Sequence, residues 1–188
     1  MPGEEQSIDN LIRDREVGYL LSPARITLLE NLPAIQVGEV SLEASQAGIT
    51  LEVPRWVAEI ITRSGFADMD EESLDAELFK ATSRERIQGS AQLASLGEDF
   101  HLKVHRYLSH FSAQSDTNPE ARATYEKLSM TAYDLLTMRM VKVIQLAASK
   151  SPPLDIFEKI TLEEKLLFNQ VQQLVSHWRS SILEETGE

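Results

Sequence analysis

The fold of this chain is decided by one stretch, which reads LLTMRMVKVIQLA at residues 135–147. Apolar residues recur in it at intervals of three and four, the spacing of an α-helix with one side toward a core. Asn118 is a good N-cap for this helix, and Pro119 suits its first position. A pair of prolines at 152–153 ends it. We therefore predict a helix from Pro119 to about Lys150.

Two basic side chains interrupt the apolar side of this helix. Arg139 and Lys142 lie three residues apart, and they either pair with acids across a helix interface or extend to solvent. We favour the interface ion pair. Other sides of the helix are also apolar, notably at Met138 and Val141. A helix that is apolar on more than one side needs more than one partner.

Further helices are predicted on both sides of this one. A long helix is expected over about residues 83–112, with Ile87 and Val104 among its buried residues. The last helix begins at a capping box, in which Thr161 and Glu164 satisfy each other's backbone N–H groups. Both helices exceed the usual length in globular proteins.

The last helix also has apolar residues on several sides. Phe168 follows two leucines in a row, and three consecutive side chains cannot share one seam at about 100° per residue. Trp178 is expected to be a core or interface anchor rather than a platform for bases. We expect the faces around Met138, Val141, Phe168 and Trp178 to be buried by another subunit. The alternative is burial by the rest of this chain.

The first third of the chain has a different pattern. Short apolar runs that alternate with polar residues, bounded by Gly and Pro, predict strands at 25–29, 34–40 and 48–53, with a further one at 17–21. A helix is expected to start at Pro54, to bury a stripe that includes Trp56, and to end at Gly65.

Together these patterns predict an α+β fold that is mainly α. A small β-rich domain with one helix would occupy residues 1–66, and an elongated bundle of long helices residues 67–188. Charge supports two modules, because residues 1–80 carry 16 acids and 6 bases whereas residues 81–188 carry 14 acids and 12 bases.

Composition excludes several classes of protein. The 188 residues hold 18 Lys and Arg and 30 Asp and Glu, a net charge of −12 that disfavours binding of duplex DNA across a broad face. The absence of cysteine excludes disulfide scaffolds, thiolate metal sites and thiol catalysis. No apolar run is long enough to span a membrane, and the first residues, MPGEEQ, lack the features of a secretory signal. We expect a soluble, intracellular protein without a cofactor.

One pair of residues has the spacing of metal ligands. His101 and His105 lie four residues apart on an expected helix, so two imidazoles could share an ion. Leu102 stands where a catalytic zinc helix has its Glu, and the sequence specifies no third ligand. A small metal-dependent enzyme using this pair is the alternative function. The acids between Asp68 and Glu77 indicate a solvated helix start or a docking surface for a basic partner.

Four segments, taken in order, resemble the subunits of the GINS complex. ITLLENLPAI at 26–35 and PRWVAEII at 54–61 are similar to the small GINS module. The helix at 135–147 resembles the Arg-x-x-Lys-apolar-x-x-Ala helix of GINS helical domains, and ITLEE at 160–164 resembles the start of their last helix. The β-rich module precedes the helical one, as in the eukaryotic second and third partner subunits and their single archaeal counterpart.

The resemblance implies a scaffold of the replicative helicase rather than an enzyme. It implies a sister subunit of opposite domain order in a two-plus-two heterotetramer, contact with the MCM helicase and a RecJ-like or Cdc-type protein, and no strong binding of duplex DNA or membranes. An archaeal source with a cytoplasmic, nucleoid-associated location is expected, or a nuclear location in a eukaryote. The positions that match the family motifs have structural roles there: Pro54, Trp56, Ala58, Arg139, Lys142, Thr161 and Glu164.

Overall fold

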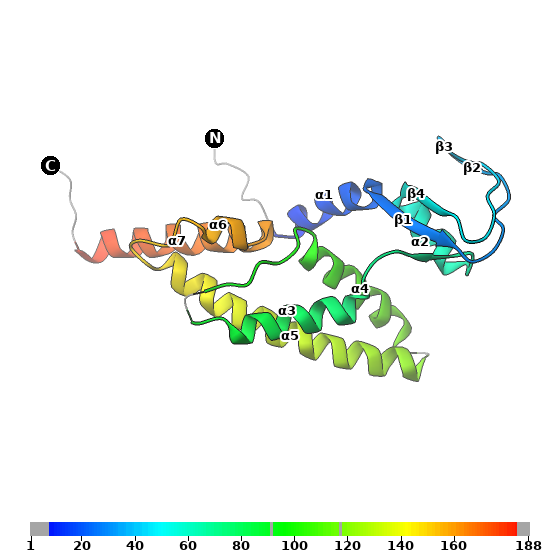
Figure 1. The fold of residues 1–188 in the computed structure, drawn as a ribbon. Coiled ribbons are helices and arrows are strands. Elements are labelled where there is room, and N and C mark those ends of the chain that lie inside the picture. The colour runs from blue at the N-terminus through cyan, green and yellow to red at the C-terminus, as the bar shows by residue number, and fades with distance from the viewer. Residues whose placement is uncertain (1–7, 91, 117, 184–188) are drawn as a thin grey trace. The chain divides into compact units, whose positions relative to one another are not determined.

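The chain forms two compact units. The computed structural model describes residues 8–90, 92–116 and 118–183. One unit runs from Asp9 to Glu72, and the other begins at Ser73. The strands found in the described residues all belong to the first unit, and the longest helices belong to the second (Figure 1), so the fold is α+β and mainly α.

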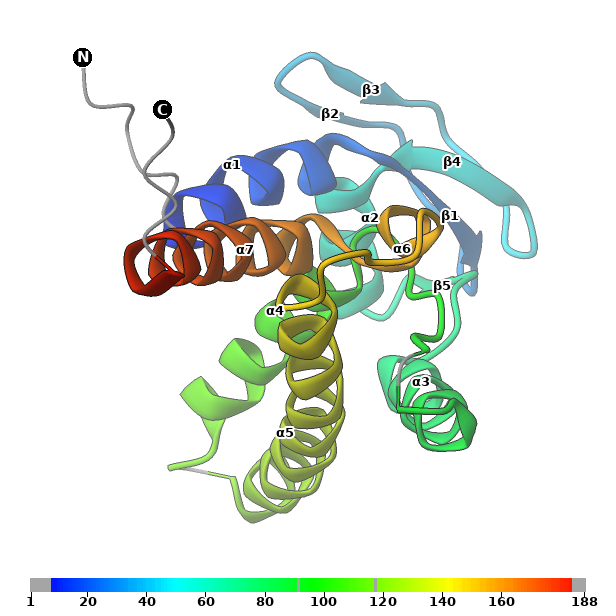
Figure 2. The ribbon, with the colours of Figure 1, turned by 90° about the vertical axis from the view of Figure 1, so that its left-hand side faces the viewer.

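The first unit is built around a three-stranded antiparallel sheet in the order β4-β1-β5. Alternate residues of β1 are buried, and they pack with one side of α2 into a core that includes Ile26 and Ala58. Figure 2 shows β4 beside β1, with the β2–β3 hairpin above them. The elements are α1 (Ile8–Leu21), β1 (Pro23–Leu28), β2 (Ile35–Val37), β3 (Val40–Leu42), β4 (Thr50–Pro54), α2 (Arg55–Arg63) and β5 (Ala67–Met69).

Three expectations for this unit are corrected. Residues 17–21 belong to α1 and not to a strand, because partly buried residues recur along α1 at helical spacing. The strand expected at 34–40 is a hairpin that turns at Gly38, whose φ of 62° suits glycine. The domain boundary follows Glu72 rather than residue 66, because β5 pairs with β1 and completes the sheet. Gly65, at φ 80°, lies just after α2 as predicted.

The second unit is an assembly of helices around α5. The three helices α3, α4 and α7 all pack against α5, and α7 meets α5 near the C-terminal end of α5 in both views (Figures 1 and 2). The predicted cap of α5 is confirmed, since the Asn118 side chain accepts hydrogen bonds from the N–H groups of Glu120 and Ala121. The elements are α3 (Leu74–Ile87), α4 (Phe100–Gln114), α5 (Pro119–Ala147), α6 (Ile156–Lys159) and α7 (Leu162–Leu183).

The single long helix expected over residues 83–112 is wrong. The helix ends at Ile87, which is exposed rather than buried as expected. The next helix begins only at Phe100, and the segment between them contains glycines at 89 and 97. The connecting segment uses its backbone groups for buried side chains: the carbonyls of Gln92 and Ala94 accept from lysine and arginine of α5. In a continuous helix those carbonyls would bond the next turn instead. Tertiary contacts therefore decide the conformation here.

Candidate interaction surface

The two sides of α5 differ in an unexpected way. Its inner face, defined as Leu128, Ala132, Leu135, Arg139, Lys142, Val143 and Leu146, is buried in the unit. Its outer face is defined as six exposed apolar residues, Met130, Tyr133, Leu136, Met140, Val141 and Ile144. At about 100° per residue, the two sets lie roughly 150° apart around the helix axis.

Arg139 is the centre of the inner face. Its side chain is 1% exposed, and all five of its guanidinium N–H donors are used. Nε and Nη2 donate to the two carboxylate oxygens of Glu164 at 2.6 and 2.7 Å. Nη1 donates to Glu85 Oε2 and to the Ala94 carbonyl, each at 2.7 Å, and Nη2 also reaches the Lys159 carbonyl at 3.1 Å. One side chain thereby joins α3, α5, α6, α7 and the segment between α3 and α4.

Lys142 completes this network from the next turn of α5. Its ammonium donates to Glu85 Oε1 at 2.6 Å, to the Glu85 carbonyl at 3.1 Å and to the Gln92 carbonyl at 3.0 Å, so all three donors are used. Glu85 also accepts from the backbone N–H of Ala94 at 3.1 Å. The predicted interface ion pair is confirmed, and both charges are satisfied inside this chain.

Glu164 has two functions in the same place. It forms the predicted capping box, because its Oε2 accepts from the Thr161 N–H at 3.1 Å and its own N–H donates to Thr161 Oγ1 at 3.3 Å. Its burial alone would raise the pKa of its carboxyl. The hydrogen bonds and the positive charge of Arg139, with His101 beside it, outweigh burial and lower that pKa to about 2.

The two histidines do not share a site. His101 is largely buried, and its Nε2 lies 3.3 Å from Glu164 Oε1, whereas His105 is exposed. In the described part of the chain, no group of three or more His, Cys, Asp or Glu side chains is arranged to hold a metal ion. No specific observation therefore favours the alternative of a metal-dependent enzyme.

Glu85 is the network residue that the sequence reading missed. It lies on the buried stripe of α3, four residues after Ala81 and seven after Leu78, both of which are buried. An acid at an apolar position of an amphipathic helix is the signal that could have identified it, since a buried carboxylate requires a partner.

The apolar seam of α7, defined as Leu167, Val171, Leu174, Trp178 and Ile182, changes from half-buried to open along its length. Phe168 is 0% exposed, and its ring packs edge-on against Phe157 at 5.2 Å between centroids. Phe168 lies beside this seam, whereas Leu174, Trp178 and Ile182 form the outer, open part of the seam and are all more than half exposed. Phe168 is thus a core residue of this chain rather than the partner contact expected for it.

The remaining expected contacts are divided in the same way. Met138 is half-buried and packs at the edge of the core formed by α3, α4 and α5. Val141 lies on the exposed outer face of α5, and Trp178 is 61% exposed. The candidate interaction surface therefore consists of the outer face of α5 and the open part of the α7 seam, each within the helical unit.

The motif residues of the first unit are structural. Pro54 is the last residue of β4, and α2 begins at Arg55 rather than at Pro54 as expected. Ala58 is fully buried against the sheet, and Trp56 packs at the edge of that core. Their neighbour Arg55, which sequence reasoning did not single out, donates from both terminal nitrogens to the carboxylate of Glu71. Its guanidinium lies 4.3 Å from the centroid of the Tyr19 ring, so it also holds α1 in place.

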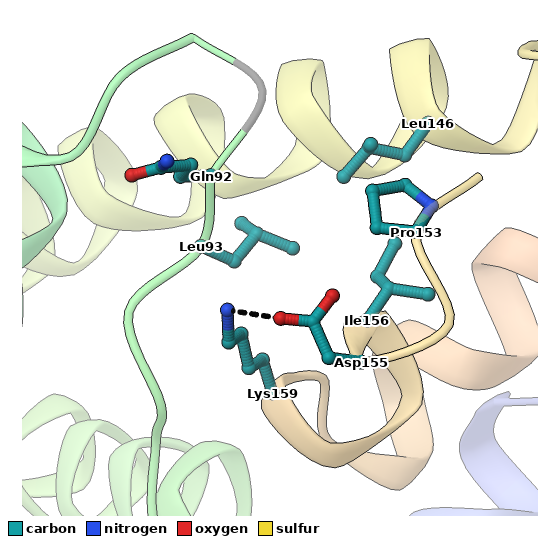
Figure 3. A pocket seen from close by; sticks show the side chains of 7 residues that line it. All are labelled: Gln92, Leu93, Leu146, Pro153, Asp155, Ile156 and Lys159. Atoms are coloured by element: carbon teal, nitrogen blue, oxygen red, sulfur yellow. Dashed lines mark hydrogen bonds and ion pairs between the residues drawn. The ribbon is translucent and has the colours of Figure 1, made fainter.

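A small pocket lies beside the network (Figure 3). It has a volume of about 340 Å³ and lies between α5, α6 and the segment that follows α3. Leu93, Leu146 and Ile156 form its apolar wall, and the ammonium of Lys159 pairs with Asp155 Oδ2 at 2.6 Å. Its size is at the lower end of the range for small-molecule sites. The charged groups of Lys159 and Asp155 beside it pair with each other rather than pointing to a ligand.

Two further observations bear on function. No helix in the described ranges has the length and apolarity needed to cross a bilayer. Neither a scan against protein-family models nor a search of curated proteins finds a match to this chain.

Proposed function

We propose that this chain is a non-catalytic subunit of a GINS-type complex, which scaffolds and activates the MCM helicase in DNA replication. The outer face of α5 carries this proposal. Six large apolar side chains are exposed on the side of the helix opposite its buried face. A contiguous exposed apolar surface of this kind marks a site of protein association.

Energetics favours a protein partner for this face. Fully burying a Leu, Ile, Val or Met side chain contributes about 1.5–3 kcal/mol. The outer-face residues are 37–71% exposed, so each retains roughly 0.5–2 kcal/mol for a partner. The open part of the α7 seam adds three more such side chains. Such a surface can offset the entropy lost on association.

The positions of the motif residues also support the proposal. Arg139, Lys142, Thr161 and Glu164 resemble GINS motif positions, and here they contact one another or share a partner in one buried network. Arg139 and Glu164 lie 25 positions apart in the sequence and bond directly, so the positions that match the family motifs lie together in the fold. Their structural roles agree with those that the family motifs imply.

The proposed assembly has defined members. The helical unit would bury its outer face against sister subunits of the opposite domain order, in a two-plus-two heterotetramer. The first unit would act as an adaptor toward the MCM helicase, and a RecJ-like or Cdc-type protein would join the complex. The complex would be nucleoid-associated in an archaeal cytoplasm, or nuclear in a eukaryote.

Light scattering after size exclusion tests the proposal. The chain is co-expressed with the sister subunit of the same genome, as wild type and with Met140→Asp and Ile144→Asp together. We expect a heterotetramer for the wild type, its loss in the double variant, and capture of MCM by the wild-type complex.

A matched control keeps this test specific. Leu154→Asp places a charge at an exposed leucine outside both faces, and assembly should persist in it. A wild-type chain that ignores its sister subunit and remains monomeric would reject the proposal, as would equal assembly of all three proteins.

A further inference from the structure

Most of α7 carries no carboxylate. Residues 165–183 contain neither Asp nor Glu, although these acids make up 30 of the 188 residues of the chain. Between residues 166 and 183 the one formal charge is that of Arg179, whose Nη2 donates to the Ala148 carbonyl of the same unit at 2.7 Å. The exposed polar residues beside the seam, such as Gln170, Gln173 and Ser181, are uncharged. A highly charged partner would therefore meet no opposite charge on this side of α7.

The open part of the α7 seam is symmetric about Trp178. Leu174 lies four residues before it and Ile182 four residues after it, and the three side chains are 61–68% exposed. Each step of four residues turns about 40° around the helix axis, so the three form one ridge about 12 Å long. Two ridges of this type pack together in the commonest class of helix pair, whose axes cross at about 50°.

This symmetry makes the ridge complementary to itself. A two-fold axis through the crossing point places Trp178 of one copy against Trp178 of the other. In the antiparallel arrangement, which also opposes the two helix dipoles, Leu174 of each copy then faces Ile182 of the other. Every large apolar side chain of the ridge thus meets another one.

Electrostatics limits the places where two copies of this chain can meet. Each copy has a net charge of −12, so contact through most of the surface would bring like charges together. The outer face of α5 is less suitable, because the exposed Asp134 lies only about 20° from Val141 around that helix. The ridge on α7 has no carboxylate beside it, so two copies can meet there without this repulsion.

We propose that the open part of the α7 seam binds a second copy of this chain, with the two α7 helices crossing at Trp178. The tryptophan lies at the centre of the contact, where the residues that contribute most to binding usually cluster. The uncharged Gln and Ser side chains around it supply the polar rim that is typical of protein interfaces.

The size of the contact sets its strength. A whole aromatic side chain buries about 150–250 Å², and three partly exposed side chains on each copy remain below the roughly 1,200 Å² of a stable interface. We therefore expect a reversible dimer whose population rises with concentration. In the proposed two-plus-two complex, this contact would join the two copies of this chain, whereas the outer face of α5 would contact the sister subunit.

A membrane surface fits the seam less well than a second copy. Helices that lie in the interface of a bilayer usually carry several Lys and Arg residues on their polar side. On α7 the polar side beyond Lys165 holds Asn, Gln, Ser and His, and the guanidinium of Arg179 bonds within the unit. These uncharged groups provide no attraction to anionic lipids.

Sedimentation equilibrium of the full chain, without a sister subunit, tests the proposal. We expect a monomer–dimer equilibrium that strengthens as salt rises, because salt screens the repulsion between two acidic chains. Trp178→Asp should weaken dimerisation by about thirtyfold or more, since it removes the central side chain from both copies and buries a charge in its place. Leu174→Ser combined with Ile182→Ser should also weaken it by about tenfold or more.

The fluorescence of Trp178 provides a second measurement. The chain has two tryptophans, so Trp56→Phe leaves Trp178 as the single reporter. Its emission should shift to shorter wavelength as the protein concentration rises, because the ring leaves water when the dimer forms. Emission that does not change over the concentration range in which the dimer forms would contradict a contact at Trp178.

Matched variants complete the experiment. Met140→Asp with Ile144→Asp changes the outer face of α5, and Leu154→Asp changes an exposed leucine outside both faces; both proteins should dimerise as the wild type does. Circular dichroism checks that each variant is folded.

Three results would overturn the proposal. They are a wild-type chain that stays monomeric at every concentration, a dimer that persists unchanged in Trp178→Asp, and binding to phosphatidylserine vesicles that Trp178→Asp abolishes. The inference fails independently of the proposed GINS role, because it is measured without the sister subunit and the assembly test changes residues of α5.

Discussion

The two sides of α5 differ from the usual pattern, because the buried side carries two charges among its apolar residues and the exposed side is apolar. The buried side holds Arg139 and Lys142, whose charges would be costly in an apolar interior. The exposed side holds methionine, leucine, isoleucine, valine and tyrosine, which water solvates poorly. One helix thus has a charged interior contact and an apolar exterior surface.

The inner face, with its buried ion network, organises the helical unit, whereas the outer face is available to a partner. A buried ion network contributes little net stability, because desolvation offsets attraction, but removing one member is costly. The N–H donors of Arg139 and Lys142 hold five segments in one arrangement, because each donor bonds a particular acceptor on one of those segments. The outer-face residues, by contrast, are exposed in the part of the chain that the structure describes. They are therefore available for association.

Arg139→Ala is expected to have the largest effect on stability and tests the inner face directly. The change leaves the carboxylates of Glu85 and Glu164 buried without their main cation, so we expect the free energy of unfolding to fall by about 3–5 kcal/mol. Urea unfolding followed by circular dichroism measures the loss. Arg122→Ala on the same helix is the control, because its ion pair with Glu126 is exposed and should contribute under about 1 kcal/mol. Equal losses in the two variants would contradict the assignment of Arg139 as the centre of the unit.

Two adjacent leucines, one on each face of α5, allow the two faces to be compared with the same side chain. Leu135 is 0% exposed on the inner face, whereas Leu136 is 44% exposed on the outer face. Leu135→Ala should lower the free energy of unfolding by about 2–5 kcal/mol, because it opens a cavity in the core. Leu136→Ala should change it by less than about 1 kcal/mol. Thermal and urea unfolding of the two variants side by side would show whether the faces are assigned correctly, and similar losses would argue against it.

Acid is expected to weaken the inner face through Glu164. The pKa of this carboxyl is about 2 in the folded chain, against an ordinary value of 4.5, because Arg139 and His101 outweigh its burial. A carboxyl with a lowered pKa stabilises the fold above its ordinary pKa and loses that contribution as pH falls toward the folded value. The contribution is about 3 kcal/mol, and it should disappear between about pH 4.5 and pH 2.

Glu164→Gln isolates this effect. The difference in unfolding free energy between wild type and Glu164→Gln should be largest near neutral pH and should shrink across that acid range. Glu158→Gln, at an exposed acid of α6, serves as the control and should leave the pH profile unchanged. A constant difference from pH 7 to pH 2 would rule out Glu164 as the titrating group.

Local patterns predicted some elements well and others poorly. The N-cap at Asn118, the capping box at Thr161 and Glu164, and the glycine stop after α2 were all predicted, because each depends on bonds within a few residues. The prediction of one helix over residues 83–112 was wrong, because distant side chains of α5 donate hydrogen bonds to backbone carbonyls within that range. No local pattern contains that competition.

The candidate surface was predicted in kind but not in detail. Apolar residues on several sides of α5 and α7 indicated excess surface, and Val141 and Trp178 are indeed exposed. Phe168 was misplaced, because which of the apolar sides of α7 is covered depends on where the neighbouring helices pack against it. Glu85 was missed because its cation partners lie more than 50 positions away in the sequence.

The sequence by itself determined the two-part α+β architecture, the limits of α5 and the pairing of its bases with acids, because these depend on periodicity, caps and the cost of burying charge. Only the tertiary structure decided which acids those are, where the second long helix breaks and which side of α5 remains open. These properties depend on contacts between residues far apart in the chain, and a side chain's surroundings exist only once the helices have packed.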